Sequence, residues 1–104
     1  MDTNRLDTLL KMAENDPTDS FTKYALGLEY SSLKESDKAI ELFEDLKRED
    51  PNYLAVYFQL GKEYETIGEF ESARKIFEKG IYVATSQNEI HTREELQQAL
   101  EDLL

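Results

Sequence analysis

The chain has 104 residues, enough for one small domain with a modest hydrophobic core. Its 23 acidic and 12 basic side chains give a formal net charge of −11 that is spread along the chain, which disfavours nucleic acids and anionic membranes as partners. The lack of cysteine excludes disulfides and thiolate-bound metals and is compatible with the cytoplasmic location that we expect for this acidic protein.

Residues 3–14 predict the first helix, because apolar side chains recur there at helical spacing: Leu6, Leu9, Met12 and Ala13. Pro17 follows at a position through which a helix does not continue. No apolar run follows a positively charged flank, so we expect no secretory signal. No stretch approaches 18 consecutive apolar residues, so we expect no membrane span.

Residues 20–87 consist of two similar halves. Ten pairs of residues 34 positions apart are identical, among them Leu26/Leu60, Gly27/Gly61, Tyr30/Tyr64, Ala39/Ala73 and Phe43/Phe77. A fixed period of this length is typical of stacked helical repeats. Glycine and alanine would let two helices approach closely, and the aromatic rings would fill the remaining gaps.

Turn residues separate the helices of each half. Pro17 and Pro51 end one helix and turn the chain into the next. Gly68 separates the two helices of the second half, and Ser36 is the predicted N-cap at the same place in the first half. The expected unit is therefore a pair of antiparallel helices, which we name A and B in chain order.

This pattern resembles the tetratricopeptide-repeat family. The family motif of a bulky residue, then Leu-Gly, Tyr, Ala-x3-Phe and Pro is matched in the second half by Tyr57-x2-Leu60-Gly61-x2-Tyr64 and Ala73-x3-Phe77. The resemblance implies an all-α, right-handed α-solenoid of antiparallel helix pairs with about six helices. We divide the single domain, residues 1–104, into a capping helix, two repeats and a second capping helix: 1–19, 20–53, 54–87 and 88–104.

Residues 92–104 predict a third A-type helix. Its apolar residues Leu96, Ala99, Leu100 and Leu103 come five residues later than the period would place them, so we expect a lengthened loop before it. Thr92 and Glu95 have the spacing of a capping box that would begin this helix. At the other end, Arg5 takes the position of Ala39 and Ala73, as expected for a terminal helix without a paired A helix.

The resemblance implies a concave groove, lined by the A helices, that holds a polypeptide. The candidate groove residues lie on the A-helix face away from the Leu-Gly-Tyr stripe: Phe21, Tyr24, Leu28, Ala55, Phe58, Gln59, Lys62 and Glu65. An A helix that is apolar on two faces must cover the second face with something. Three coverings stay open: the N-terminal helix or its turn, the apolar side chains of a partner, or a second copy of the chain.

Some members of the family bind the terminal carboxylate of chaperones through Lys and Asn on the A helices. Tyr24, Leu28 and Gln59 occupy the corresponding positions here, so we do not expect that clamp. An apolar anchor with polar contacts from Lys62 and Gln59 is the preferred interpretation. The expected partner is a protein or peptide of neutral to basic charge.

The residues do not favour catalysis. His91 is the single histidine, and Glu29 and Glu63 are equivalent repeat positions that favour an ion pair or a polar face over an acid/base pair. No phosphate loop, nucleophile elbow or zinc-protease motif occurs. We expect no enzyme activity, cofactor or metal site, but a protein-interaction module acting as a scaffold or adaptor. The alternative is an architectural domain, a weak homo-oligomer that self-associates through its terminal helices.

Overall fold

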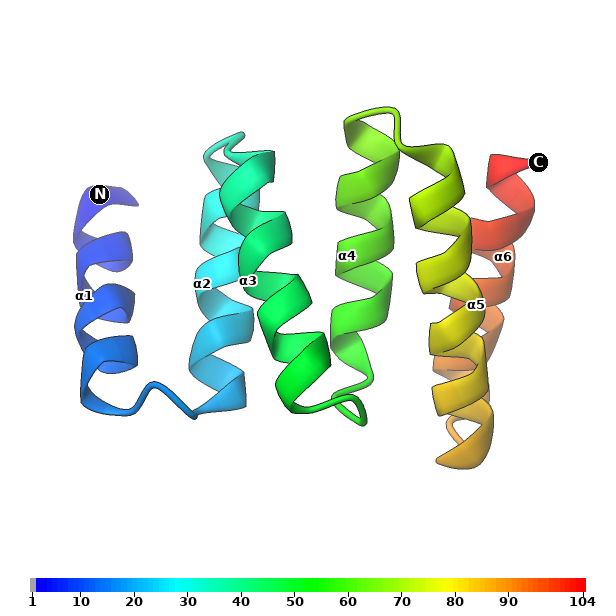
Figure 1. The fold of residues 1–104 in the computed structure, drawn as a ribbon, viewed down its shortest axis with the longest axis horizontal. Coiled ribbons are helices and arrows are strands. Elements are labelled where there is room, and N and C mark those ends of the chain that lie inside the picture. The colour runs from blue at the N-terminus through cyan, green and yellow to red at the C-terminus, as the bar shows by residue number, and fades with distance from the viewer. Residues whose placement is uncertain (1) are drawn as a thin grey trace.

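The structure is a computed structural model that describes the backbone of residues 2–104 and the side chains of residues 5–104. Met1, where the predicted capping segment begins, lies outside the described residues. Within them the chain forms six helices and no strand, which confirms the predicted all-α repeat fold (Figure 1). The helices are α1 (Asp2–Asn15), α2 (Ser20–Ser32), α3 (Ser36–Glu49), α4 (Ala55–Thr66), α5 (Phe70–Ser86) and α6 (Ile90–Leu103).

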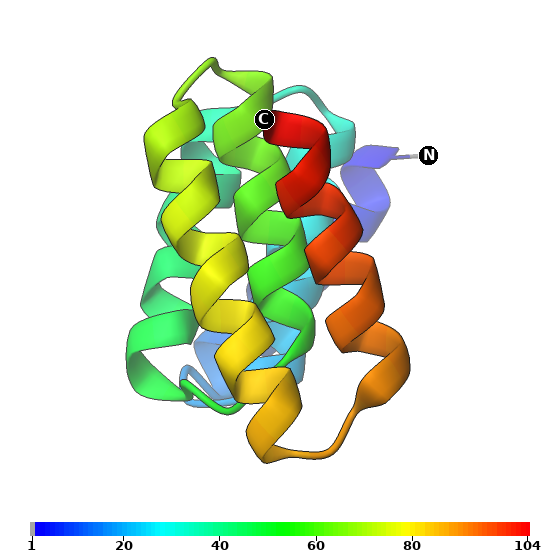
Figure 2. The same cartoon turned by 90° about the vertical axis from the view of Figure 1, so that its right-hand side faces the viewer.

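The helices stack side by side in chain order. The closest neighbours are α2 with α3, α4 with α5 and α5 with α6. Figure 2 shows α3 and α5 on one side of the molecule and α2 and α6 on the other. We therefore keep the name A helices for α2, α4 and α6, and B helices for α3 and α5. None of the described helices is long and apolar enough to cross a membrane.

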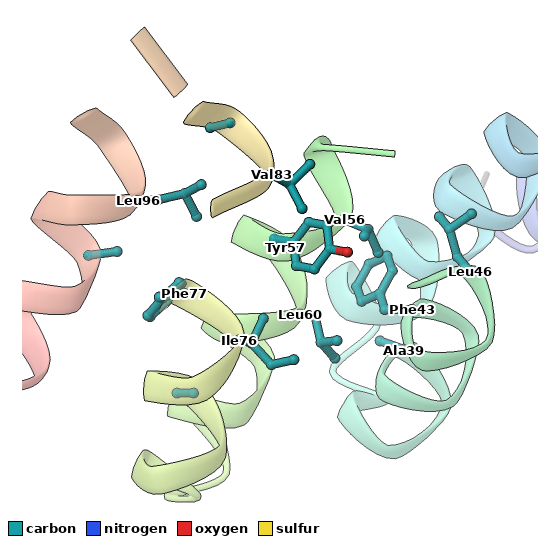
Figure 3. Packing of buried hydrophobic residues seen from close by; sticks show 13 residues of the cluster. Ala39, Phe43, Leu46, Val56, Tyr57, Leu60, Ile76, Phe77, Val83 and Leu96 are labelled. Carbon is teal, nitrogen blue, oxygen red and sulfur yellow. The ribbon is translucent and has the colours of Figure 1, made fainter. Parts of the chain in front are cut away.

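The core lies between the A and B helices, and its largest buried side chains include Phe43, Tyr57 and Phe77 (Figure 3). A Cβ added to Gly27 would lie 2.2 Å from Cε1 of Phe43, and a Cβ added to Gly61 would lie 2.3 Å from Cε1 of Phe77. Each glycine thus makes room for the phenylalanine ring of its own repeat. This confirms the predicted role of glycine in bringing the two helices together.

The three turns that follow α2, α4 and α5 share one backbone geometry. Lys34, Gly68 and Asn88 occupy the left-handed region with φ of +65°, +82° and +59°. In each turn the next N–H donates to a carbonyl five residues earlier, over 2.8 to 2.9 Å. The predicted lengthened loop before the last helix is therefore wrong. Three residues separate α5 from α6, whereas five separate α3 from α4, and α5 has 17 residues where α3 has 14.

Two predicted helix starts are also wrong. Ser36 is the first residue of α3 and Glu35 takes the N-cap position, without a side-chain cap hydrogen bond. Helix α6 begins at Ile90, so Thr92, predicted to cap it, lies inside its first turn. Both helices follow a tight turn that fixes the backbone by its own hydrogen bonds, so neither start depends on a polar side chain.

Helix α1 packs against α2 and covers the N-terminal end of the stack. Its Arg5 holds the buried carboxylate of Glu29 on α2, with 3.1 Å between Nε and Oε1. An ion pair therefore stands where the B helices have a small alanine. Glu63, the repeat counterpart of Glu29, accepts a hydrogen bond from the Ser31 hydroxyl. Both glutamates thus link neighbouring elements of the stack.

Candidate peptide-binding groove

Two aromatic side chains on the A helices pack against phenylalanine rings of the core. The ring centroids of Tyr24 and Phe43 are 6.0 Å apart, and those of Phe58 and Phe77 are 6.3 Å apart. Tyr24 and Phe58 are equivalent positions of the repeat, and both are partly buried. Each glycine makes room for the phenylalanine ring of its repeat, and Tyr24 or Phe58 packs against that same ring.

The Tyr24 side of the groove is closed by the next repeat. The Tyr24 ring lies 5.5 Å from the ring of Tyr53, which precedes α4, and the side-chain amide of Gln59 on α4 lies near its hydroxyl. Burial raises the pKa of Tyr24, and the nearby Gln59 side chain opposes this rise. Leu28 is partly buried against the core. Within the described side chains, the contacts of Tyr24 with Tyr53 and Gln59 thus come from the following repeat.

The Phe58 side of the groove is open. A hollow of about 260 Å³ lies between α4 and α6, lined by Phe58, Lys62, Glu95, Gln98, Ala99 and Asp102. The counterparts of Tyr53 and Gln59 one period later are Gln87 and Arg93, which are not among these lining residues. Glutamine and arginine thus stand at the sequence positions where the first seam has Tyr53 and Gln59, and the hollow lies beside Phe58 instead of such a covering.

Polar side chains surround the hollow. The ammonium of Lys62 lies 3.1 Å from Oε1 of Glu65, one turn along α4. On α6, Gln98 donates a hydrogen bond of 3.0 Å to Oδ1 of Asp102. The Glu95 side chain is 57% exposed, and its Oε2 is 4.0 Å from Nε2 of His91. The hollow therefore combines an apolar base from Phe58 and Ala99 with an ionisable rim.

The structure brings only some of the predicted groove residues together. Phe58 and Lys62 line the hollow, and Glu65 pairs with Lys62 beside it. Gln59 is engaged with Tyr24 on the closed side. Phe21, 64% exposed, and Ala55, also exposed, do not line the hollow. Binding by any of these residues stays a prediction.

The sequence interpretation misses the α6 side of the groove. The four α6 residues of the hollow follow the i, i+3, i+4, i+7 spacing of one helical face: Glu95, Gln98, Ala99 and Asp102. This spacing is visible in the sequence, next to the apolar stripe that identifies the helix. Because residues 92–104 are predicted only as a capping helix, the face of α6 that lines the hollow is not among the predicted groove residues.

A second hollow, of about 290 Å³, lies among α1, α2 and α3 and includes Leu10 and Tyr30 in its lining. One repeat later, Glu44 takes the position of Leu10, and its carboxylate accepts a hydrogen bond from the Tyr64 hydroxyl. This hollow thus reflects a lost side-chain contact at the terminal helix. It lies apart from the aromatic side chains of the groove.

Candidate catalytic groups are few among the described residues and do not gather in one place. No three of their histidine and carboxylate side chains are grouped so as to hold a metal ion. The side chain of His91 is 88% exposed at the start of α6. Nucleophilic or acid/base chemistry needs several such groups in one enclosed pocket.

The comparisons with known proteins agree with this geometry. A profile of the tetratricopeptide repeat matches residues 22–53 and 54–87. The crystal structure of a tetratricopeptide repeat domain protein from Salinibacter ruber is 35% identical, covers 82% of this chain and 94% of that chain, and has a TM-score of 0.78. None of the curated proteins matches this chain by sequence.

Two other structures share the fold at low identity. The TPR2B domain of yeast Sti1, in complex with pHsp70, has a TM-score of 0.91 at 17% identity and covers 98% of this chain and 82% of that chain. PcrH, in complex with the chaperone binding region of PopD, has a TM-score of 0.91 at 16% identity and covers 98% and 77%.

The two matched segments together span more than half of the chain and fall on the pairs α2–α3 and α4–α5. In both pairs the glycine and phenylalanine of the repeat motif pack against each other. The chain therefore belongs to the tetratricopeptide-repeat family.

Proposed function

We propose that this chain is a protein-interaction module that holds a peptide or protein segment in the groove of its A helices. The observation that carries the proposal is the open hollow between α4 and α6, with Phe58 at its base. Its role is that of a scaffold or adaptor without catalysis. The partner inserts an apolar side chain over Phe58, and the net charge of −11 favours a neutral to basic partner.

The physical support for an anchor at Phe58 is its rigidity. The ring rests on Phe77, which is fully buried, so a partner side chain would meet a surface that is already ordered. A preorganised aromatic surface loses little conformational entropy on binding, and aromatic residues dominate the energetics of many interfaces. The anchor position therefore combines exposed apolar area with fixed geometry.

The hollow suits single side chains of a polypeptide. Its volume of about 260 Å³ is near the lower limit of the roughly 300–1,000 Å³ that is typical of small-molecule sites. It is also open along the groove, between two helices of the stack. One or two apolar side chains of an extended or helical segment would fit such a site.

The relatives support the same class of function. The yeast Sti1 domain was solved in a complex with pHsp70, and PcrH with a segment of PopD, on folds that superpose on nearly all of this chain. The same arrangement of helices is therefore compatible with holding a polypeptide. Which surface of this chain does so is part of our proposal.

Self-association through the terminal helices is the second candidate. It is favoured by apolar side chains exposed at both ends of the stack: Leu10, Met12 and Leu104, which are 39%, 44% and 89% exposed. Light scattering over a tenfold or wider range of protein concentration tests it. A constant monomer mass would exclude self-association, whereas a mass that rises with concentration would support it.

The main proposal is tested by selecting random 12-residue peptides from a display library on the full chain. The affinity of a selected peptide is then measured for wild type, for Phe58→Ala and for Tyr82→Ala. Tyr82 is the matched control, because it is a 67% exposed aromatic residue on α5 outside the hollow. We expect Phe58→Ala to weaken binding by more than about 1 kcal/mol, or fivefold, and Tyr82→Ala to leave it unchanged. Equal affinity for Phe58→Ala and wild type would refute the anchor.

A further inference from the structure

Resting on the proposed function, we propose that the groove selects segments in which a lysine or arginine accompanies the apolar anchor. The cation is held by Glu95 and Asp102 of α6, beside the ring of Phe58. This assigns to α6 the choice of partner, in addition to its role of covering the C-terminal end of the stack.

The charges around the hollow point to a cationic partner. Three of its lining residues are charged, and two of these are the carboxylates Glu95 and Asp102. The third, Lys62, is already paired with Glu65, which adds a carboxylate beside the hollow. The lining thus carries net negative charge before a partner binds. An acidic segment would meet like charges there, and a basic one would meet unlike charges.

The spacing on α6 suits a long basic side chain. Glu95 and Asp102 are two helical turns apart, about 10 Å along the axis, and lie on the same side of α6. Ala99 lies between them in sequence and contributes its small side chain to the lining of the hollow. The hydrocarbon stem of a lysine or arginine can pack on Ala99 and Phe58 while its charged end reaches one of the carboxylates.

The neighbouring groups strengthen this assignment. The hydrogen bond from Gln98 engages one oxygen of Asp102 and restrains its carboxylate. The face of an aromatic ring attracts a cation within about 6 Å. The ring of Phe58 can therefore contact the apolar anchor and also attract the charged end of the basic side chain. The overall charge of −11 also brings basic segments toward the protein faster than acidic ones.

The test uses the full chain and the same library of random 12-residue peptides. Three proteins are compared: wild type, the double variant Glu95→Gln plus Asp102→Asn, and the double variant Glu94→Gln plus Glu101→Gln. The last is a matched control, because its two exposed glutamates are also seven residues apart on α6 but do not line the hollow. Both double variants change the net charge equally.

We expect peptides selected on wild type to be enriched in lysine or arginine next to an apolar residue. At low salt, the affinity of one selected peptide should fall about three- to tenfold for the Glu95/Asp102 variant, and less than twofold for the control. Thermal unfolding of both variants should match wild type, since the altered side chains are exposed. This separates lost binding from lost folding.

Two results would overturn the assignment. Selected peptides without enrichment in basic residues would do so, and so would equal losses for the two double variants, which would indicate only the general field of the protein. Either result leaves the proposed function standing if Phe58→Ala still weakens binding. If Phe58→Ala binds every selected peptide as wild type does, the proposed groove and its charge selection both fail.

Discussion

Replacing Gly61 with alanine tests the contact on which both the core and the groove are built. The new Cβ would lie 2.3 Å from Cε1 of Phe77 and 2.7 Å from its Cδ1 and Cζ. Carbon atoms in contact are normally about 3.5 Å or more apart, so the ring or the helix must move by about 1 Å. The ring has no free space to enter, because Phe77 is fully buried and also contacts Phe58.

Two opposing free energies decide the outcome for Gly61→Ala. Alanine in a helix interior is favoured over glycine by about 1 kcal/mol, and overpacking of a buried site costs about 1–3 kcal/mol. With the overlap so large, we expect the upper part of that range and a net loss of about 1–2 kcal/mol. For a domain of this size the melting temperature, followed by circular dichroism, should fall by about 4–15 °C.

Gly68→Asn is the matched control for this prediction. Gly68 has φ of +82° and no atom within 4 Å of an added Cβ, and asparagine already occupies the same turn position at Asn88. Its stability should change by less than about 0.5 kcal/mol. A Gly61→Ala protein as stable as wild type, with the Gly68→Asn variant unchanged, would refute the account of how the helix pairs close.

Three further predictions concern stability. Asp19→Ala removes the carboxylate that caps α2 at the N–H of Thr22, so calorimetry should show a loss of about 1 kcal/mol that Asp19→Asn does not cause; an unchanged alanine variant would contradict the cap. Arg5→Ala leaves the buried Glu29 without its cation, so hydrogen exchange should quicken in α1, and unaltered protection there would contradict the ion pair. Burial raises the pKa of four tyrosines in the folded protein: Tyr24, Tyr53, Tyr57 and Tyr64. Because the phenols of the unfolded chain ionise near pH 10, denaturant unfolding should show stability falling as the pH rises above about 10. Constant stability up to about pH 12 would contradict this.

The sequence predicts the helix pairs well because the packing requirement repeats. Gly27 and Gly61 lie at the same place in their helices, and each meets the phenylalanine 16 residues later, so one physical contact leaves its mark twice in the chain. The left-handed turn at Gly68 is equally visible, since glycine adopts positive φ at little cost.

The start of α6 could not be read from the repeat motif. No third copy of the motif is present after residue 87, so no repeated residue marks where α5 ends and α6 begins. Gly80 packs closely against both neighbouring helices: a Cβ there would lie 2.7 Å from Cβ of Tyr57 and 3.0 Å from Cδ1 of Leu96. It has no counterpart in the first repeat, where Leu46 takes its place. Asn88, which favours the left-handed region, is the one local indication of the turn.

The candidate groove is only half predictable for a similar reason. The stripe on each A helix identifies Tyr24 and Phe58 as equivalent side chains, but whether each is covered depends on the element that follows. Tyr53 and Gln59 lie against the first, whereas a hollow between α4 and α6 lies beside the second. Whether Tyr24 or Phe58 is covered depends on contacts between neighbouring repeats, and the sequence pattern within one repeat does not predict such contacts.

The most direct measurement of the central claim is a set of intermolecular nuclear Overhauser effects between the full chain and a bound, isotope-labelled peptide from the library selection. We predict contacts from an apolar side chain of the peptide to the ring protons of Phe58 and the methyl group of Ala99, on the facing sides of α4 and α6. Contacts confined to the other side of the stack, such as the ring of Tyr82 on α5, would contradict the claim that this groove holds the partner.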